Sequence, residues 1–445
     1  MKELYICSEC SYKSSKWLGK CLECEAWNSF EPIEHFKKKS GGSVKKIVKK
    51  DAHLFSDVKV AEDGRLSTDI SEFDRVLGGG LVEGSVVLLS GKPGIGKSTL
   101  LLQVLDKYSK KMKVLYVAGE ESAAQVKGRG NRLGVKGNFY ILPEVNVTSV
   151  RDYIEANRPK VVVIDSIQTL YNPDVGSIPG TISQIREVSL EIVRLAKDFN
   201  ISFLVVGHIT KDGKIAGPKL LEHMVDTVLE FEGEEEAVYR VLRATKNRYG
   251  SVNEIGIFNM DASGINGVTN PSEYFLEGRG NAAGSVVVPV LEGNRVLLVE
   301  VQSLVSNAIF GMPRRLSQGI DGTKVQMLAA VIEKQAKVNL TSKDIFFNIP
   351  GGVASKDTAL GLGIVFSLIS SYKETAIAQD VAVMGEVGLT GEVRKVPFAL
   401  KRAKELEKIG FKKIYAPAGN AKELSKVNIK VQYLENIFDL VQRIN

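Results

Sequence analysis

The stretch GKPGIGKST, residues 91–99, constrains the fold more than any other part of the chain. It fits the pattern G-x-x-x-x-G-K-[ST], follows the apolar run SVVLLS and opens the helical pattern STLLLQVL. Its glycines let successive backbone N–H groups turn toward phosphate oxygens, and a helix N-terminus adds its positive dipole end. The motif therefore predicts a phosphate-binding loop, and we expect its residues to bind a nucleotide: Gly91, Lys92, Pro93, Gly94, Ile95, Gly96, Lys97, Ser98 and Thr99.

Two residues of this loop and one downstream carboxylate predict the chemistry of the site. We expect Lys97 to reach the β- and γ-phosphates of ATP and Ser98 to ligate Mg²⁺. In VVVIDS, Asp165 ends an apolar strand, which is where a carboxylate of the magnesium shell is expected. An acid at that place can also merely cap a turn. Next to a phosphate-binding loop, the magnesium role is the favoured interpretation.

A hydrolase also needs a group that orients or deprotonates water. Glu120 and Glu121 follow the strand-like run KVLYVAG, and Glu120 is the predicted base because it is nearer the strand end. The alternative is that both are solvated loop acids. His208 ends the run ISFLVVGH, and we expect it to contact the γ-phosphate, since the carboxyl end of a central strand faces the ligand crevice. A lone histidine is otherwise usually a structural residue.

Continuous apolar runs without alternation predict strands that are covered on both faces, as in a mostly parallel sheet flanked by helices. STLLLQVLDKY and SQIREVSLEIVRLAKDFN carry apolar residues at helical spacing, so an α/β layered domain is expected. The predicted strands lie at residues 85–90, 113–119, 160–166, 201–208, 224–231 and 239–246.

A second regular region begins after Pro271. Residues 285–305 read as two strands around a Glu-Gly-Asn turn, which predicts a hairpin. Helical patterns and further strands follow, so this region is predicted to be an α+β domain. The expected organisation is a knuckle at 1–30, a basic flexible linker at 31–60, an ATPase domain at 61–272 and the α+β domain at 273–445.

All four cysteines lie within the first 24 residues, as Cys7-x₂-Cys10 and Cys21-x₂-Cys24. Four thiolates complete a closed tetrahedral zinc shell, so the pattern predicts a structural Zn²⁺ site. A pair of redox dithiols is the alternative, because CxxC also marks thioredoxin-type chemistry. Trp17 and Trp27 are expected to form the small core of the knuckle, or else to offer a stacking surface for a base.

The charge of the chain permits a polyanionic partner without requiring one. Net charge is +7 over 445 residues, and residues 36–50 hold seven lysines and no acid. No apolar run approaches the roughly 20 residues needed to span a bilayer. The start, MKELYICSEC, has no apolar signal-peptide region, and we expect a cytoplasmic protein without membrane contact.

Together, the four-cysteine knuckle, GKPGIGKST, VVVIDS, the turn KNRYG at 246–250 and the downstream region resemble the bacterial RadA family, also called Sms. The resemblance covers essentially the whole chain. It implies the fold class α/β, with a RecA-like P-loop ATPase core, an N-terminal zinc knuckle and a C-terminal Lon-protease-like domain. It also implies a hexameric ring that moves on single-stranded and branched DNA and drives branch migration alongside the RecA recombinase.

The resemblance assigns roles to further residues. Lys246 and Arg248 in the KNRYG turn are expected to couple ATP hydrolysis to DNA, by acting on phosphate or on DNA. The position of His208 implies that residues 209–219 form a DNA-binding loop. That segment and the basic stretch RRLSQGIDGTK supply the expected DNA contacts: Lys211, Lys214, Lys219, Arg314 and Arg315.

A protease is the rival function that the Lon-like region raises. A Ser–Lys dyad needs a serine nucleophile and a lysine base within hydrogen-bond reach. At the position expected for the serine the chain has Leu360, and at the position expected for the base it has Leu400, with Lys401 adjacent. Ser355 lies five residues before the expected position. The domain is therefore predicted to be proteolytically inactive.

Overall fold

The computed structural model describes residues 4–7, 12–22, 27–33, 54, 64–207, 220–233, 239–308, 313–352 and 355–441. The chain divides into two compact units, and we describe each by itself. The first unit comprises Met1–Glu232, Ala244–Ser251 and Asp261–Ile265, and the second holds Gly233–Arg243, Val252–Met260 and Asn266–Asn445. Some predicted site residues lie outside the described residues, namely Cys10, Cys24, His208, Lys211, Lys214 and Lys219.

The amino-terminal residues form a small antiparallel sheet in the order β2-β1-β3. Its strands are β1 (Leu4–Cys7), β2 (Lys13–Ser14) and β3 (Phe30–Ile33). Cys7, Cys21 and Phe30 make its core, and both cysteines are 1% exposed. Trp17 and Trp27 are 52% and 73% exposed, so the expectation that they form this core is wrong. Tyr5, Tyr12 and Leu18 pack against this core instead.

A nine-stranded sheet runs in the order β14-β13-β12-β11-β6-β10-β9-β7-β8. From β11 to β8 all neighbours are parallel, whereas β12 and β13 pair antiparallel. The four central strands are buried along their whole length, which explains their continuous apolar sequences. The strands are β6 (Val86–Gly91), β7 (Val114–Ala118), β8 (Tyr140–Leu142), β9 (Val161–Asp165), β10 (Ser202–Val206), β11 (Thr227–Glu232), β12 (Tyr239–Asn247), β13 (Ile255–Asp261) and β14 (Gly264–Gly267).

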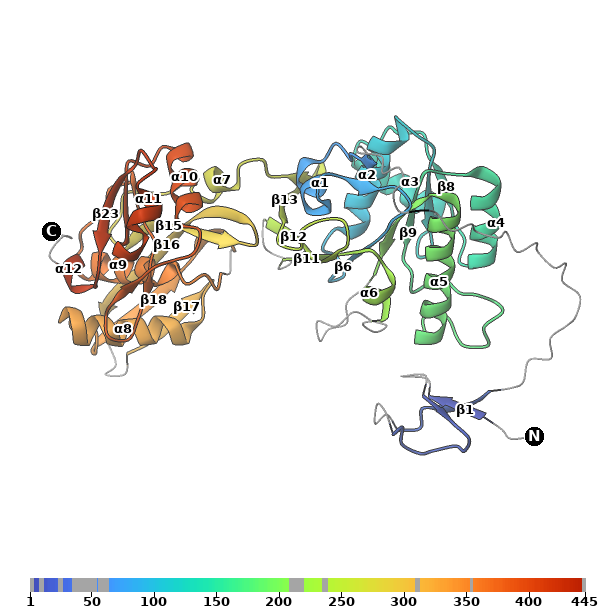
Figure 1. Cartoon of the computed structure of the whole chain (residues 1–445), viewed down its shortest axis with the longest axis horizontal. Helices are drawn as coiled ribbons and strands as arrows, with labels where there is room; N and C mark the ends of the chain where they lie inside the picture. The colour runs from blue at the N-terminus through green and yellow to red at the C-terminus, as the bar shows by residue number, and fades with distance from the viewer. Residues whose placement is uncertain are drawn as a thin grey trace, which may run out of the picture. The chain divides into compact units, whose positions relative to one another are not determined.

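Helices pack on both faces of the parallel strands (Figure 1). On one face, Val86 and Leu88 of β6 belong to an apolar cluster with residues of α4 and α5, such as Ile154 and Ile192. The side chains that alternate with them point to the opposite face, where α2 packs against β6, β7, β9 and β10. The helices of this unit are α1 (Ser71–Leu77), α2 (Lys97–Ser109), α3 (Ala123–Arg132), α4 (Val147–Asn157), α5 (Ile182–Phe199) and α6 (Leu220–Met224), and β4 (Arg65–Leu66) pairs with β5 (Leu81–Val82).

The second unit is built on a seven-stranded mixed sheet in the order β17-β18-β16-β15-β19-β22-β23. The predicted hairpin is confirmed, because β15 and β16 pair antiparallel from Ser285↔Gln302 to Glu292↔Arg295. The strands are β15 (Ser285–Glu292), β16 (Arg295–Asn307), β17 (Arg315–Gln318), β18 (Lys343–Asn348), β19 (Val381–Val383), β22 (Lys413–Pro417) and β23 (Lys430–Leu434), and β20 (Glu386–Val387) pairs with β21 (Val393–Arg394).

Helix α9 (Leu360–Tyr372) is the central helix of this unit, and it is buried from Leu360 to Ser371. It packs against β15 and β16, where Gly363 lets it approach Val288 more closely than any side chain would allow. The other helices are α7 (Pro271–Phe275), α8 (Gly322–Ala336), α10 (Ala399–Ile409), α11 (Ala421–Leu424) and α12 (Phe438–Val441), with single 3₁₀ turns at Pro350–Gly352 and Ala418–Asn420. Among the residues that the structure describes, no helix is long and apolar enough to cross a membrane.

The strands predicted between residues 85 and 246 all occur, and one of them begins later than predicted. The run at 224–231 was expected to be a single strand, but α6 ends at Met224 and β11 begins only at Thr227. Strand β3 runs to Ile33, three residues past the boundary predicted at residue 30. The domain boundaries at 30, 60 and 272 stay predictions, and the predicted linker lies almost entirely outside the described residues.

A buried ion pair holds α10 against the second unit's core. Arg402 and Asp357 have side chains that are 1% and 5% exposed, and Arg402 Nη1 lies 2.6 Å from Asp357 Oδ2. Arg402 also donates to the carbonyls of Pro289 and Pro397, and Asp357 accepts from the N–H groups of Ala359 and Leu291. Each charge is therefore fully compensated, and removal of either partner would leave the other buried without its counter-charge.

We predict that Asp357→Ala lowers the free energy of unfolding of the second unit by about 3–5 kcal/mol, because Arg402 stays buried and unpaired. Urea denaturation of the full chain, followed by amide hydrogen exchange in α9 and α10, measures this loss. Arg394→Ala is the matched control, since Arg394 pairs with Glu392 at the surface and its loss should change little. Equal effects of the two variants would contradict the assignment of Asp357 as a buried anchor.

Candidate active site

The phosphate-binding loop connects β6 to α2, as the sequence predicts. Gly91 ends β6 at φ 153°, where a Cβ atom would lie 2.7 Å from the carbonyl oxygen of Phe231 in β11. Gly96 precedes α2 at φ 109°, a backbone conformation that favours glycine. The two glycines let the chain turn sharply between a buried strand and a buried helix, with the N-terminus of α2 at the loop.

Lys97 points into this loop. Its ammonium group donates to the carbonyls of Gly91 and Lys92 at 2.8 and 2.9 Å, and the residue is 4% exposed. Burial lowers the pKa of Lys97 to about 8, while the nearby carboxylates of Asp165 and Glu120 act in the opposite direction. The loop, Asp165 and Glu120 therefore lie close together at the carboxyl ends of parallel strands, which is where α/β sheets bind ligands.

Asp165 and Glu120 come from neighbouring strands that end side by side. Ala118 of β7 pairs with Asp165 of β9, and the Gly119 N–H donates to the Asp165 carbonyl at 2.8 Å. Glu120 follows directly and accepts a hydrogen bond from Ser166 Oγ. The structure thus brings the exposed Glu120 beside the residue after Asp165, where a carboxylate can accept a proton from water held at the loop.

Glu121 has a different environment. Its Oε2 forms an ion pair with Arg129 Nη2 at 2.9 Å, but the N–H group does not point at the oxygen well enough for a hydrogen bond. Arg129 also donates to Tyr116 Oη at 3.0 Å, and Tyr116 Oη in turn donates to Asp165 Oδ2. Neither Tyr116 nor Arg129 is among the site residues predicted from the sequence. The one sequence feature that could have indicated Tyr116 is its hydroxyl, which stands inside the apolar run KVLYVAG.

The donor sets fit the two metals that the motifs imply. Ser98 is the second residue of α2, and its hydroxyl, with the carboxylate of Asp165, is the oxygen chemistry that Mg²⁺ takes in phosphate-binding sites. Cys7 and Cys21 lie buried in one small core, as expected for two of four zinc thiolates. Cys10 and Cys24 fall outside the described residues, so the complete zinc set stays a prediction.

Lys246 lies near the end of strand β12, rather than in the turn that follows it, and it caps helix α6. Lys246 Nζ donates to the carbonyls of Glu222, His223 and Val225, at 2.5, 3.2 and 2.7 Å. An ammonium group has three donors, so all of them meet carbonyls at or just beyond the C-terminal end of one helix. Burial lowers the pKa of Lys246, and the nearby Arg248 cation lowers it further.

Arg248 lies in the turn that follows β12 and is more exposed. Its side chain is 52% exposed, and Nη1 pairs with Asp226 Oδ1 at 3.2 Å. The other carboxylate oxygen of Asp226 accepts from the N–H of Val86, the first residue of β6. Arg248 therefore sits at the amino end of β6, whereas the phosphate-binding loop begins at the carboxyl end. The two ends are about 16 Å apart at ~3.3 Å per residue, so Arg248 cannot reach the loop of its own chain.

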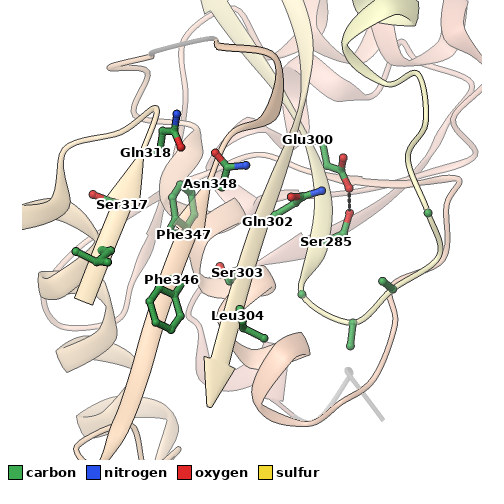
Figure 2. A pocket seen from close by; sticks show the side chains of 15 residues that line it. Ser285, Glu300, Gln302, Ser303, Leu304, Ser317, Gln318, Phe346, Phe347 and Asn348 are labelled. Atoms are coloured by element: carbon green, nitrogen blue, oxygen red, sulfur yellow. Dashed lines mark hydrogen bonds between the residues drawn. The ribbon is translucent and has the colours of Figure 1, made fainter. Parts of the chain in front are cut away.

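The second unit has a hollow about 700 Å³ in volume, and strand β17, which begins at Arg315, lines it with Leu316, Ser317 and Gln318 (Figure 2). Cross-strand pairing builds its floor in two rows, an amide row of Gln302, Asn348 and Gln318 and an apolar row of Leu304, Phe346 and Leu316. Arg314 pairs with Asp344 at 3.1 Å and lies 5.8 Å from the ring centre of Phe346. Arg315 donates to the carbonyl of Leu340 at 3.5 Å.

This sheet order, with a phosphate-binding loop after β6 and acids at the ends of β7 and β9, defines a P-loop ATPase with a RecA-like core. Family models agree along the chain. An AAA domain matches residues 52–214, a rubredoxin metal-binding domain matches residues 5–32, and a Lon protease (S16) C-terminal proteolytic domain matches residues 293–444.

Curated relatives match nearly the whole chain, and each is named DNA repair protein RadA. The protein of Streptococcus pyogenes is 47% identical, covering 94% of this chain and 92% of its own length. Those of Bacillus subtilis and Aquifex aeolicus are 46% and 43% identical, over 94% and 96% of this chain and 93% and 96% of theirs. The chain belongs to the bacterial RadA family of DNA repair proteins. A solved KaiC-like protein of Pyrococcus horikoshii is 23% identical over 46% of this chain and 98% of its own, with a TM-score of 0.39.

We predict that nucleotide affinity falls as the pH rises above about 8. Lys97 is a cation below its pKa, which burial lowers to about 8, and a neutral amine cannot attract phosphate. Bound phosphates favour the cation, so binding takes up a proton above pH 8 and affinity falls by up to tenfold per pH unit. Fluorescent ADP titrations between pH 7 and 9.5 measure the effect.

Lys97→Arg is the control for this prediction. Its guanidinium does not titrate in this range, so its affinity, although weaker, should be flat with pH. A wild-type affinity that is equally flat would contradict the lowered pKa of Lys97.

Proposed function

We propose that this protein is a DNA-dependent ATPase that acts in homologous recombination and DNA repair. It binds single-stranded and branched DNA as a ring, with six subunits the expected number, and promotes branch migration together with the RecA recombinase in the cytoplasm. The observation that carries the proposal is the meeting of the phosphate-binding loop, Asp165 and Glu120 at one sheet edge, in a member of a DNA repair family.

ATP would bind along residues 91–99, with Lys97 on the β- and γ-phosphates and Ser98 and Asp165 holding Mg²⁺. When bound, Mg²⁺ would neutralise part of the phosphate charge. Glu120 would orient water and accept its proton. Its contact with Ser166, next to Asp165, supports this choice over Glu121, which Arg129 holds in an ion pair. His208 would contact the γ-phosphate, and Zn²⁺ would be held by Cys7, Cys10, Cys21 and Cys24.

Lys246 would couple the DNA-binding segment to the ATPase core within one subunit. Residues 209–219, with Lys211, Lys214 and Lys219, immediately precede α6 in the chain, and Lys246 caps the other end of that helix. A change in how the segment holds DNA would pull on α6 and hence on the turn. The three carbonyl contacts support this positioning role over direct contact of Lys246 with DNA.

Arg248 would act on the ATP of a neighbouring subunit. Because Arg248 lies at the amino end of β6, it cannot contact the phosphate-binding loop of its own chain. Its guanidinium group is half exposed and has further N–H donors besides the one that meets Asp226. A cation supplied in trans to the transferring phosphoryl group raises turnover by orders of magnitude in related chemistry. Arg314 and Arg315 would add phosphate contacts from the Lon-like domain.

Two alternatives remain, an ATP-switched scaffold that binds DNA without moving along it and an ATP-dependent protease. Against the protease, Leu360 is fully buried at the start of α9, and Ser355 Oγ donates to Glu292 at 2.7 Å. Lys401 donates to the side-chain oxygen of Asn294. These contacts support an inactive domain that serves as a platform.

The test of the proposed function is strand displacement from a three-strand junction with ATP. We predict that the wild type displaces the strand and that single-stranded DNA stimulates its ATP hydrolysis. Lys97→Ala should lower both activities at least a hundredfold. Lys111→Ala is the control, because Lys111 is an exposed cation that pairs with Asp69 on the same unit. ATP-dependent junction binding without displacement would favour the scaffold, and casein degradation would favour the protease.

A further inference from the structure

We infer that Tyr116 and Arg129 are positioning residues that hold Asp165 in the orientation needed to bind Mg²⁺. The inference rests on the proposed function, because it takes Asp165 as a residue of the magnesium shell. Neither side chain is expected to touch ATP. Both act through carboxylates that do the chemistry, as outer-shell partners of metal ligands commonly do.

Tyr116 lies in the middle of β7 and reaches across to β9. Its backbone pairs with Val163, two residues before Asp165, so side chains of Tyr116 and Asp165 can meet on one face of the sheet. Tyr116 is 1% exposed, and its hydroxyl donates to Asp165 Oδ2.

Arg129 closes the network from α3. Its Nη2 lies 3.0 Å from Tyr116 Oη, 2.9 Å from Glu121 Oε2 and 3.8 Å from Asp165 Oδ2. One guanidinium group therefore links the hydroxyl that orients Asp165 to the loop that carries Glu120. Helix α3 is fixed at its start by a capping box between Ser122 and Gln125, which holds the position of Arg129 relative to that loop.

Packing alone does not explain the hydroxyl. Every other residue of β7 is apolar and buried, and a phenylalanine ring would fill the same volume as Tyr116. The hydroxyl meets one oxygen of Asp165, Oδ2, and Arg129 approaches the same oxygen. A carboxylate that is held from one side presents its other oxygen in a fixed direction, so less reorganisation is needed when a cation binds.

Loss of such a partner typically weakens metal affinity by about 10–100-fold. We therefore expect Tyr116→Phe to raise the Mg²⁺ concentration that half-saturates the ADP complex by at least tenfold, with ADP affinity in EDTA unchanged. Arg129→Gln should shift the same midpoint in the same direction. The readout is fluorescent ADP binding to the full chain as a function of Mg²⁺, which does not depend on turnover.

Tyr108→Phe is the matched control. Tyr108 is also fully buried in the first unit, and its hydroxyl donates to the carbonyl of Leu66 at 2.8 Å, away from Asp165. It should leave the Mg²⁺ midpoint unchanged, even if it lowers stability. An equal shift in Tyr108→Phe would mean that loss of any buried hydroxyl moves the midpoint, and would overturn the inference.

Asp165→Asn separates this inference from the proposed function. If Asp165→Asn raises the Mg²⁺ midpoint and Tyr116→Phe does not, the inference is wrong and the magnesium role of Asp165 stands. If Asp165→Asn leaves the midpoint unchanged, the proposed role of Asp165 fails, and the inference fails with it. A rise in both variants, with Tyr108→Phe unchanged, supports the positioning role.

Discussion

The parallel pairing of β6 with β10 and β11 is the constraint on which the ATPase core depends. At its carboxyl end β6 leads into the phosphate-binding loop. Parallel pairing continues from β10 to β9 and from β9 to β7, which aligns Asp165, at the end of β9, with the end of β7, just before Glu120. At its amino end the first N–H of β6 is held by Asp226, which also pairs with Arg248. One buried strand thus connects the nucleotide site to the KNRYG turn.

Under the proposed function, the two cations of KNRYG would have different roles. Lys246 uses its three donors on carbonyls at the end of α6, so it would act within its own chain. Arg248 is half exposed at the sheet edge opposite the loop, so any phosphate it meets belongs to another molecule. DNA binding and ATP hydrolysis would then be coupled through short helices and turns rather than through one residue that touches both.

The sequence predicted the elements that local patterns specify. The loop at 91–99, the buried strands and the 285–305 hairpin follow from glycine spacing, apolar runs and a turn signal, and all are present. What it could not predict depends on tertiary packing. The cap of Lys246 on α6 and the Tyr116–Arg129 contacts depend on register between elements far apart in sequence. Trp17 and Trp27 were misplaced because aromatic rings in a small domain need not be its core.

Subunit mixing tests this division most directly. Lys97→Ala rings are mixed with either Arg248→Ala or Lys246→Ala rings, and DNA-stimulated ATP hydrolysis is compared with that of each parent. We expect recovery with Arg248→Ala, because an intact Arg248 from one subunit would complete the intact loop of its neighbour. We expect no recovery with Lys246→Ala, because Lys246 and Lys97 must then serve the same subunit. Failure to recover activity with Arg248→Ala, in rings shown to exchange subunits, would contradict a role of Arg248 in trans.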